Sequence, residues 1–315
     1  MNNNARFGKG LFFACLAFFL WGMFPLYWRL LAAVHPLHIL AFRILLSLVL
    51  VGTMLLAKKN LVWLTAFREP RKACFLIMTG ALLCVNWGLY IWAVNHERTL
   101  EASLGYYISP LLSVLLGLLF FRERLRPLQW AAVAIAFSGV LILTVLSGVL
   151  PWISLVLALT FGFYGLLKKT LAFSSLESLG AETLVSLPVG LLLFFVNVEQ
   201  GDAPFLAFTG PRGLAYIAAL PAHTLVLLAL CGVATMLPLY FFGRSTKLLP
   251  LSTVGFAQFL GPTLQFLIAL FVFGEAFPSY YFVAFLLIWI AVILYIVSLR
   301  PAVRPTAVGR KSGRR

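Results

Sequence analysis

Ionisable side chains inside long apolar segments are the residues of this sequence with the clearest chemical potential. Arg43 lies about six residues into the second apolar segment, which is about 9 Å deep at the helical rise of about 1.5 Å per residue. A charged group at that depth usually faces a protein interior or a water-filled cavity, where it can bind a substrate. Arg43 is therefore a candidate for a substrate cavity, and the alternative is that its side chain extends to the membrane surface.

Two glutamates could carry protons. Glu182 lies a little over one turn into the seventh apolar segment, and Glu101 opens the fourth. Intramembrane carboxylates form proton relays in pumps and transporters, so both residues are candidates for proton coupling. The alternatives are an interfacial position for Glu182 and a favourable charge at the positive end of a helix dipole for Glu101.

Uncharged polar and aromatic side chains could line a cavity for an organic substrate. The candidates are Asn86, Trp87, Tyr106 and Gln258. Ligand pockets combine aromatic walls with a few polar groups that fix orientation. The alternative for Asn86 and Gln258 is a hydrogen bond between helices, and for the aromatic residues it is packing or anchoring at the membrane surface.

Two prolines interrupt apolar segments near their middles. Pro110 cannot donate to the carbonyl of Tyr106, and Pro262 cannot donate to that of Gln258. A freed carbonyl in hydrocarbon must find a partner in protein or in a water-filled cavity. Both prolines are thus expected to bend their helices beside the candidate cavity. A structural kink held by a neighbouring helix is the alternative.

The segments around these prolines are copies of each other. Residues 89–126 and 239–277 both begin with Leu-Tyr, and their prolines match after a two-residue slip. Duplicated segments with interrupted helices are typical of secondary transporters. The repeat therefore indicates a fold of two related halves and points to a transporter.

The elements that must position these residues are transmembrane helices. The chain has 315 residues, of which 62% are hydrophobic and 10% charged, with a mean hydropathy of +1.02. Apolar runs of about 20 residues predict membrane-spanning helices, whereas a transmembrane β-barrel would show apolar and polar residues in alternation. The ten predicted segments are about 10–31, 37–57, 73–94, 100–121, 127–146, 150–168, 178–198, 220–243, 250–273 and 278–298.

Basic residues predict the orientation. With short loops and alternating directions, 20 of the 24 Lys and Arg fall on one side and three on the other, and Arg43 lies within a span. Positive residues favour the cytoplasmic side, so both termini are predicted to be cytoplasmic. The predicted parts are a first five-helix half at 1–146, a second at 150–298, and a basic, disordered tail at 299–315. Five helices per half makes the two halves inverted.

Other function classes find little support. The net charge of +15 comes from loops and tail rather than from a basic face, which argues against nucleic-acid binding. The sequence has neither a phosphate-binding loop nor the common hydrolase motifs, so we expect no enzyme and no cofactor. Cysteines with metal-ligand spacing are lacking too, and no metal site is expected. The four cysteines are Cys15, Cys74, Cys84 and Cys231.

Several motifs together resemble the drug/metabolite transporter superfamily, specifically RarD-type permeases with two EamA-type halves. They include Phe19-Leu-Trp-Gly-Met-Phe-Pro25, Arg43, Asn86-Trp87, Leu100-Glu-Ala-Ser-Leu-Gly-Tyr-Tyr-Ile-Ser-Pro110, Glu123 and Gly255-Phe-x-Gln-Phe-x-Gly-Pro262 with Glu275. The likeness covers nearly all ten segments. It implies a ten-helix carrier of the inner (plasma) membrane, and it supplies no substrate.

The sequence therefore predicts an all-α integral membrane protein that moves a small organic metabolite or drug by alternating access. The expected partners are the lipid bilayer, that substrate and a coupling ion. The alternative is a membrane-embedded enzyme or a membrane assembly subunit without transport. The symmetric placement of the polar interruptions favours the transporter, because enzymes concentrate catalytic residues on one side.

Overall fold

The structure is a computed structural model, and it describes residues 3–32, 34–95, 99–146, 148, 152–197, 207–208, 220–274 and 279–299. Within these residues, nine helices are long and apolar enough to cross a membrane. The all-helical membrane class that the sequence predicts is therefore confirmed. The predicted basic tail, except for its first residue, lies outside the described residues.

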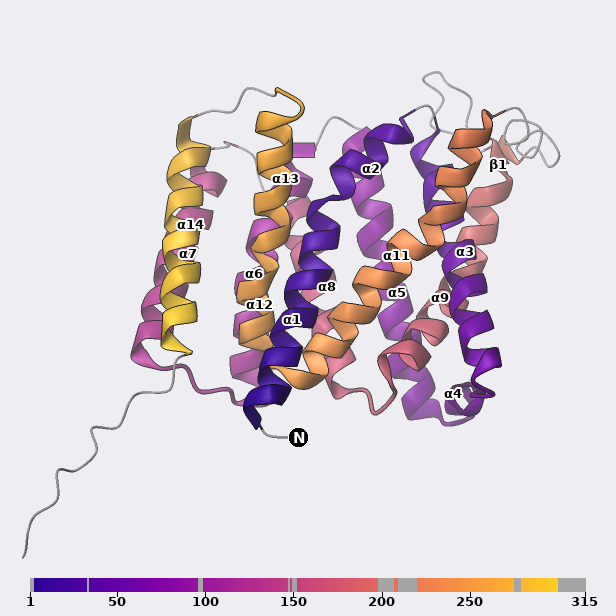
Figure 1. Cartoon of the computed structure of the whole chain (residues 1–315), viewed down its shortest axis with the longest axis horizontal. Coiled ribbons are helices and arrows are strands. Elements are labelled where there is room, and N and C mark those ends of the chain that lie inside the picture. The colour runs from indigo at the N-terminus through magenta and orange to yellow at the C-terminus, as the bar shows by residue number, and fades with distance from the viewer. Residues whose placement is uncertain are drawn as a thin grey trace, which may run out of the picture.

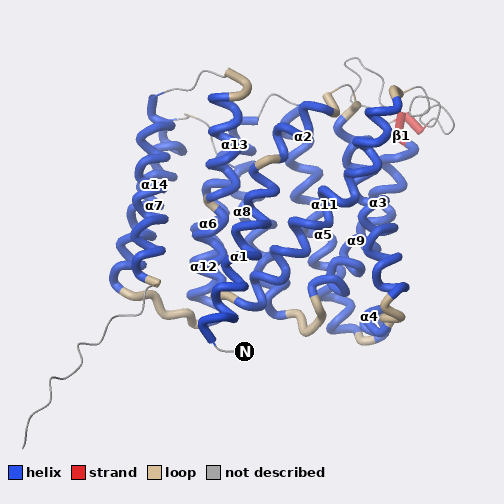
Figure 2. The backbone as a smooth tube through the Cα atoms, viewed as in Figure 1, coloured by secondary structure: helices blue, strands red, loops and turns tan. Residues whose placement is uncertain are grey.

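The first half of the chain forms helices separated by short loops (Figures 1 and 2). Two short pieces, α4 and the 3-10 helix η1, lie between the second and third long helices. The elements are α1 (Asn3–Gly22), α2 (Phe24–Leu30), α3 (Pro36–Ala57), α4 (Val62–Thr65), η1 (Ala66–Arg68), α5 (Pro70–Asn95), α6 (Thr99–Phe121) and α7 (Pro127–Leu146).

The second half continues in the same manner. A two-residue antiparallel pairing of β1 with β2 follows the second of its long helices. The elements are α8 (Trp152–Thr170), α9 (Ser175–Phe195), β1 (Val196–Asn197), β2 (Ala207–Phe208), α11 (Ala222–Leu248), α12 (Leu251–Gln258), α13 (Leu260–Phe271) and α14 (Ser279–Ser298).

Prolines set the start of many helices. Pro36, Pro70 and Pro127 are the first residues of α3, α5 and α7, and Pro221 and Pro250 precede α11 and α12. Proline suits these positions, because its fixed φ fits the first turn and its missing N–H has no helical partner there anyway.

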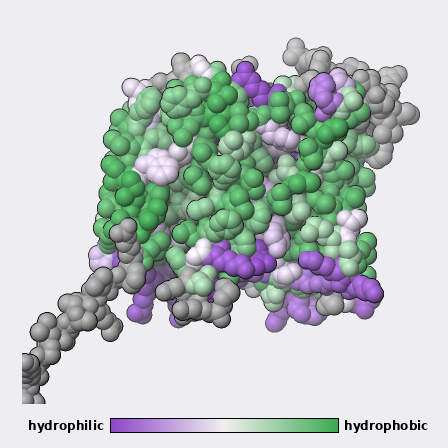
Figure 3. Space-filling model, in the orientation of Figure 1, coloured by the Kyte–Doolittle hydropathy of each residue, from purple (hydrophilic) through white to green (hydrophobic). Residues whose placement is uncertain are grey.

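An apolar belt surrounds the bundle. Large side chains such as those of Phe271, Val145 and Leu286 are exposed on the outside of the helices. Figure 3 shows apolar residues over the middle of one face, with hydrophilic residues gathered at the edge where α1 begins. This surface suits hydrocarbon, and the helices satisfy their own backbone hydrogen bonds there.

The helices pack in pairs from opposite halves of the chain. α1 packs on α11, α3 on α9, α6 on α12, and α7 on α14. Further extensive pairs are α5 with α8 and α9, α6 with α8, and α11 with α3. A residue in one half therefore commonly has its neighbours in the other.

Two of the spans are interrupted. The first breaks at Met23 between α1 and α2, and the eighth of the nine candidate helices in chain order breaks at Phe259 between α12 and α13. Pro262 follows the second break by three residues, whereas α6 continues as one helix through Pro110. The two breaks lie beside each other, because α1 packs on both α12 and α13.

Candidate functional site

A cavity of about 290 Å³ lies where the two interrupted helices meet. Its walls come from both halves of the chain, and they combine aromatic rings with a few polar groups. The lining residues are Phe18, Trp21, Phe24, Pro25, Trp28, Arg43, Asn86, Trp87, Tyr90, Tyr106, Phe161, Leu239, Gln258, Gly261, Pro262 and Gln265. All five predicted cavity residues and one of the two predicted helix-bend prolines are among them. The structure thus brings these residues together, while substrate binding there stays a prediction.

Arg43 reaches the cavity from α3. Its Nε donates to Thr235 Oγ1 on α11 at 3.0 Å. Its Cζ lies 5.1 Å from the ring centroid of Trp28 and 4.8 Å from that of Trp87. Two aromatic rings and one hydrogen bond therefore hold the guanidinium in place, and its terminal nitrogens have no hydrogen-bond partner in the described chain. Arg43 faces the protein interior.

Asn86 and Gln258 line the cavity and also join helices. The Asn86 amide donates to the Leu157 carbonyl at 3.0 Å and to Thr160 Oγ1 at 2.8 Å, both on α8. The Gln258 amide on α12 donates to Ser109 Oγ on α6 at 2.6 Å. The two roles that the sequence left open for these residues are thus compatible, because one amide can face a cavity and still connect two helices.

Two tyrosines stand together at the cavity wall. The rings of Tyr90 and Tyr106 are 5.8 Å apart in an edge-to-face arrangement. Both line the cavity, and neither hydroxyl has a hydrogen-bond partner among the residues that the structure describes. These hydroxyls are available to a ligand. Sequence reasoning selected Tyr106 from its repeat position and missed Tyr90, one helical turn from the selected Asn86.

The break between α1 and α2 has its own proline. Pro25 cannot donate to the carbonyl of Trp21, and the side-chain amide of Gln265 on α13 donates to that carbonyl at 3.1 Å. The two broken helices therefore stabilise each other at the cavity. This role of Pro25 and Gln265 was not predicted from the sequence, where the available signal was the proline at the end of the motif that begins at Phe19.

Aromatic rings close the cavity towards the side where α1 begins. Trp21, Phe161 and Phe242 contact one another, with ring centroids 5.2 to 5.8 Å apart. Tyr164 stacks on Phe242 at 5.8 Å. The rings come from α1, α8 and α11, and they belong to or pack against one buried cluster at the cavity wall.

A buried ion pair lies beyond this aromatic cluster. Lys168 Nζ of α8 is 2.7 Å from Glu182 Oε1 of α9, and both side chains are fully buried. Tyr164 donates to Glu182 Oε2 at 3.0 Å, and Ser178 Oγ donates to Oε1 at 2.9 Å. Glu182 is thus buried within the protein, and both of its carboxylate oxygens have partners. Lys168 was not selected from the sequence, because it is the last residue of an apolar segment and was counted with the loop that follows.

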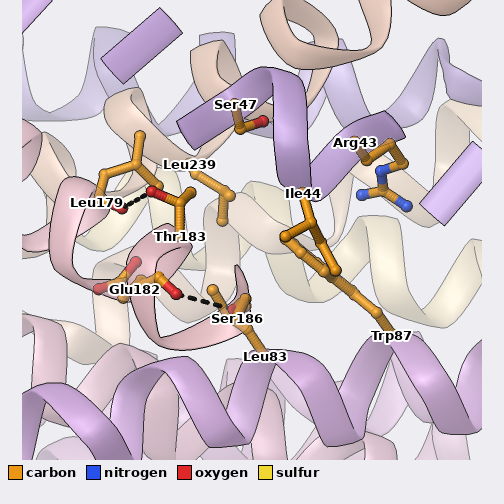
Figure 4. A pocket seen from close by; sticks show the side chains of 10 residues that line it. All are labelled: Arg43, Ile44, Ser47, Leu83, Trp87, Leu179, Glu182, Thr183, Ser186 and Leu239. Carbon is orange, nitrogen blue, oxygen red and sulfur yellow. Dashed lines mark hydrogen bonds between the residues drawn. The ribbon is translucent and has the colours of Figure 1, made fainter. Parts of the chain in front are cut away.

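A small hollow connects the surroundings of Arg43 with those of Glu182 (Figure 4). It shares Arg43, Trp87 and Leu239 with the large cavity. Ser47, Thr183 and Ser186 add hydroxyl groups, although each of them already bonds a backbone carbonyl. The hollow is therefore narrow and weakly polar, and it links the cavity to the ion pair.

A third cavity, of about 340 Å³, opens on the side of the molecule where α3 and α11 end. Three basic residues line it: Lys58, Arg244 and Lys247. Ser175 also lines it, is nearly fully buried, and has no hydrogen-bond partner for its hydroxyl. No acidic residue is among the lining residues that the structure describes, so this cavity carries positive charge.

Two further predicted site residues, Pro110 and Glu101, are not among the described residues that line the cavity. Pro110 packs against α12, where a Cβ on Gly255 would lie 2.7 Å from its carbonyl oxygen. Glu101 belongs to α6, but its side chain lies outside the described residues. Glu123 accepts hydrogen bonds from the backbone of Leu251 and Ser252 at 2.6 and 3.0 Å, and so caps α12.

Comparison with known proteins decides the family. Residues 8–145, from α1 through nearly all of α7, match the EamA-like transporter family. Protein RarD of Streptomyces exfoliatus is 42% identical, and the match covers 95% of this chain and 91% of that one. The chain belongs to the EamA-like transporter family. Its RarD type, which the motifs predicted, is confirmed by this relative.

Two further proteins are similar to this chain over most of its length. An uncharacterised transporter of Pseudomonas aeruginosa is 41% identical, over 92% of this chain and 94% of that one. A crystal structure of a protein matches with a TM-score of 0.65 at 18% identity, covering 92% of this chain and 99% of that chain. The second match concerns the fold alone. Both extend over the two halves of this EamA chain.

Proposed function

We propose that this EamA protein is a secondary transporter that moves a small organic substrate across the membrane by alternating access. The observation that carries the proposal is the cavity between the interrupted helices, lined by residues of both halves. Discontinuous helices that meet at a shared site are a recurrent feature of transporters. Relatives named as transporters also favour this function. The substrate is held at Arg43, Trp87 and Tyr106, with Asn86 and Gln258 completing the wall.

The proposed architecture has ten spans in two inverted halves, at 1–146 and 150–298, with α6 as the span additional to the nine long candidates. The pattern of helix contacts supports it. If the spans of the first half correspond in order to those of the second, then α1 on α11 is equivalent to α8 on α5, and α3 on α11 to α9 on α5. The pairs α3 with α9, α6 with α12 and α7 with α14 are each equivalent to themselves.

Two glycine contacts support the same correspondence. A Cβ on Gly22 would lie 2.7 Å from Leu264 Cβ, and one on Gly162 would lie 2.8 Å from Leu112 Cδ2. Leu112 and Leu264 each follow the matched proline of their half by two residues. Since each half brings a glycine of its first helix onto the same position in the fourth helix of the other half, the two halves share one packing design. Both termini are proposed to be cytoplasmic, in an inner (plasma) membrane.

Proton coupling is proposed for Glu182. The Glu182 carboxylate pairs with Lys168, and Glu182 lines the small hollow together with Arg43. A change in the charge of Glu182 would therefore alter the barrier between the cavity and the cytoplasmic side. Glu101 is a second candidate by its position in the sequence. Bends at Pro110 and Pro262 are proposed to shape the site during the transition.

Uptake into proteoliposomes tests the transporter proposal. The purified protein is reconstituted, and accumulation of radiolabelled metabolites and drugs is followed under an imposed pH gradient, an imposed membrane potential, or neither. Saturable uptake that empty liposomes lack is the expected result. Absence of uptake for neutral, anionic and cationic compounds under every gradient would contradict the proposal.

A further inference from the structure

Arg43 lacks an anionic partner. Within the described chain, no carboxylate lies within ion-pair distance of its guanidinium, and its one hydrogen-bond partner is the hydroxyl of Thr235. Arg43 is also the one charged residue among those described around the cavity. A charged group within a membrane is normally paired, because its removal from water is expensive. The structure therefore holds a positive charge that is positioned and uncompensated.

Glu182 and Glu177, two carboxylates of the described chain, are already engaged. Glu182 is paired with Lys168 at 2.7 Å and accepts from Tyr164 and Ser178. Glu177 accepts from Asn60 Nδ2 at 2.7 Å and from the Ser174 backbone at 2.6 Å. Neither is among the residues that line the large cavity. A cationic ligand would thus meet Arg43 without meeting an available carboxylate in the described part of the chain.

Hydrogen-bond donors surround the free face of Arg43. The hydroxyls of Tyr90 and Tyr106 line the same cavity and interact electrostatically with the guanidinium. Both are unpartnered in the described chain, and a phenol donates readily to a carboxylate. A guanidinium presents parallel N–H groups that match the two oxygens of a carboxylate. These groups together form a receptor for one carboxylate.

The rest of the wall is suited to an apolar body. Trp28 and Trp87 stack beside Arg43, and Phe18, Trp21 and Phe161 continue the aromatic surface. A cavity of about 290 Å³ is at the small end of ligand pockets, which are typically about 300–1,000 Å³. The geometry fits a metabolite-sized molecule with one anionic group and a flat or apolar remainder.

We propose that the cavity takes small organic anions, with the substrate's carboxylate on Arg43 and its apolar part against the tryptophans. The inference rests on the proposed transport function and narrows it to a substrate class. The third cavity agrees with it. Lys58, Arg244 and Lys247 line that cavity, and none of its described lining residues is acidic, although Glu177 and Glu182 interact electrostatically with Lys247. The excess of basic side chains would favour anions there.

The test compares molecules that share a skeleton and differ in charge. Phenylacetate, phenylacetamide and phenethylamine form one such set, and indole-3-acetate, its amide and tryptamine form a second. Binding is measured by thermal stabilisation of the purified full-length protein, because a ligand that prefers the folded state raises its unfolding temperature. Uptake of the same labelled compounds into proteoliposomes is measured in parallel.

Three variants and one control separate the charge from the fold. Arg43→Gln removes the charge and is expected to weaken carboxylate binding at least about tenfold, the effect of losing a charge-assisted hydrogen bond. Arg43→Lys keeps the charge without the planar fork and is expected to lose less. Thr235→Val removes the hydroxyl that orients Arg43 and gives an intermediate loss. Arg29→Gln is the control, because Arg29 is an exposed arginine of α2 that stacks on Phe273 outside the cavity.

The outcomes distinguish this inference from the transport proposal. Stabilisation by the carboxylates alone, lost in Arg43→Gln and kept in Arg29→Gln, supports the anion site. If the amines or amides bind and are transported, and Arg43→Gln leaves this unchanged, the anion inference is overturned while the transport function stands. If the carboxylates bind at Arg43 but no compound is taken up, the transport function fails and the anion site stands. A protein that responds to no member of either set contradicts the anion inference.

Discussion

At the scale of single residues, the existing hydrogen bonds of each polar side chain show whether it connects helices or is free to bind a ligand. The amide donors of Asn86 and Gln258 connect helices, whereas the terminal nitrogens of Arg43 and the hydroxyl of Tyr106 face the cavity without a partner in the described chain. Residue type and depth in the membrane were enough to select all four from the sequence. The sequence could not show which of the four are bonded to another helix. That depends on which polar atoms of the neighbouring helices lie within hydrogen-bond distance.

The ion pair of Lys168 and Glu182 gives the first prediction. Glu182→Leu leaves Lys168 buried without its counter-charge, and the loss of folding free energy is expected to be about 3–5 kcal/mol. The double variant Lys168→Met/Glu182→Leu removes both charges and is expected to recover most of that loss. Thermal unfolding of the purified proteins in one detergent measures both. Equal instability of the double and single variants would show that the pair is not what matters at this position.

Coupling at Glu182 is the second prediction at this scale. The double variant is expected to bind its substrate and yet to lose the dependence of uptake on the pH gradient, because the carboxyl group proposed to carry the proton is absent. Uptake in proteoliposomes with and without the gradient measures this. The expectation is wrong if the gradient still drives accumulation in the double variant as strongly as in the parent protein.

At the scale of elements, the interrupted helices create the cavity. The sequence predicted a bend at Pro262, and the break lies three residues earlier at Phe259, because a proline disturbs the turn that precedes it. The break at Met23 was not predicted, although Pro25 causes it in the same way. Pro110 lies in a helix that stays continuous, so the bend expected there remains a prediction. A proline marks a weakened turn, and only the packing of neighbouring helices decides whether that turn opens.

The cap of α12 gives a prediction about an element. Glu123→Ala removes the acceptor of the Leu251 and Ser252 backbone N–H groups, and a loss of about 1–3 kcal/mol is expected from donors left without a partner. Glu69→Ala is the matched control. Glu69 is exposed and pairs with Lys72 at 2.8 Å, an interaction worth about 1 kcal/mol or less. Equal shifts in unfolding temperature would argue against the cap.

At the scale of the whole molecule, the helical membrane class followed from composition, and the contact pattern of the helices supports the repeat seen in the sequence. The sequence predicted ten segments, and nine long candidate spans appear in the described chain together with a shorter apolar stretch, Gly105–Phe121. The further residues that line the cavity and the aromatic cluster beside it could not be predicted. Both arise from faces of α1, α8 and α11 that are nearly as apolar as the faces exposed to lipid, so hydropathy does not identify them.

The inverted topology can be tested with reporter fusions. Fusions after residue 95, in the connection that follows α5, are expected to activate a periplasmic phosphatase reporter and not a cytoplasmic fluorescent one. Fusions after residue 124, between α6 and α7, and after the last residue are expected to do the opposite. The same reporter response at residues 95 and 124 would mean that α6 does not cross the membrane.

The central claim is that one cavity opens alternately to the two sides of the membrane. In a variant whose four cysteines are replaced, Phe161→Cys places a single thiol on α8 at the cavity wall, next to the aromatic cluster. The measurement is labelling by a membrane-impermeant maleimide in right-side-out and in inside-out vesicles. The account predicts labelling from both sides, slowed from both by a transported substrate. Labelling from one side only, unchanged by substrate and by imposed gradients, would contradict it.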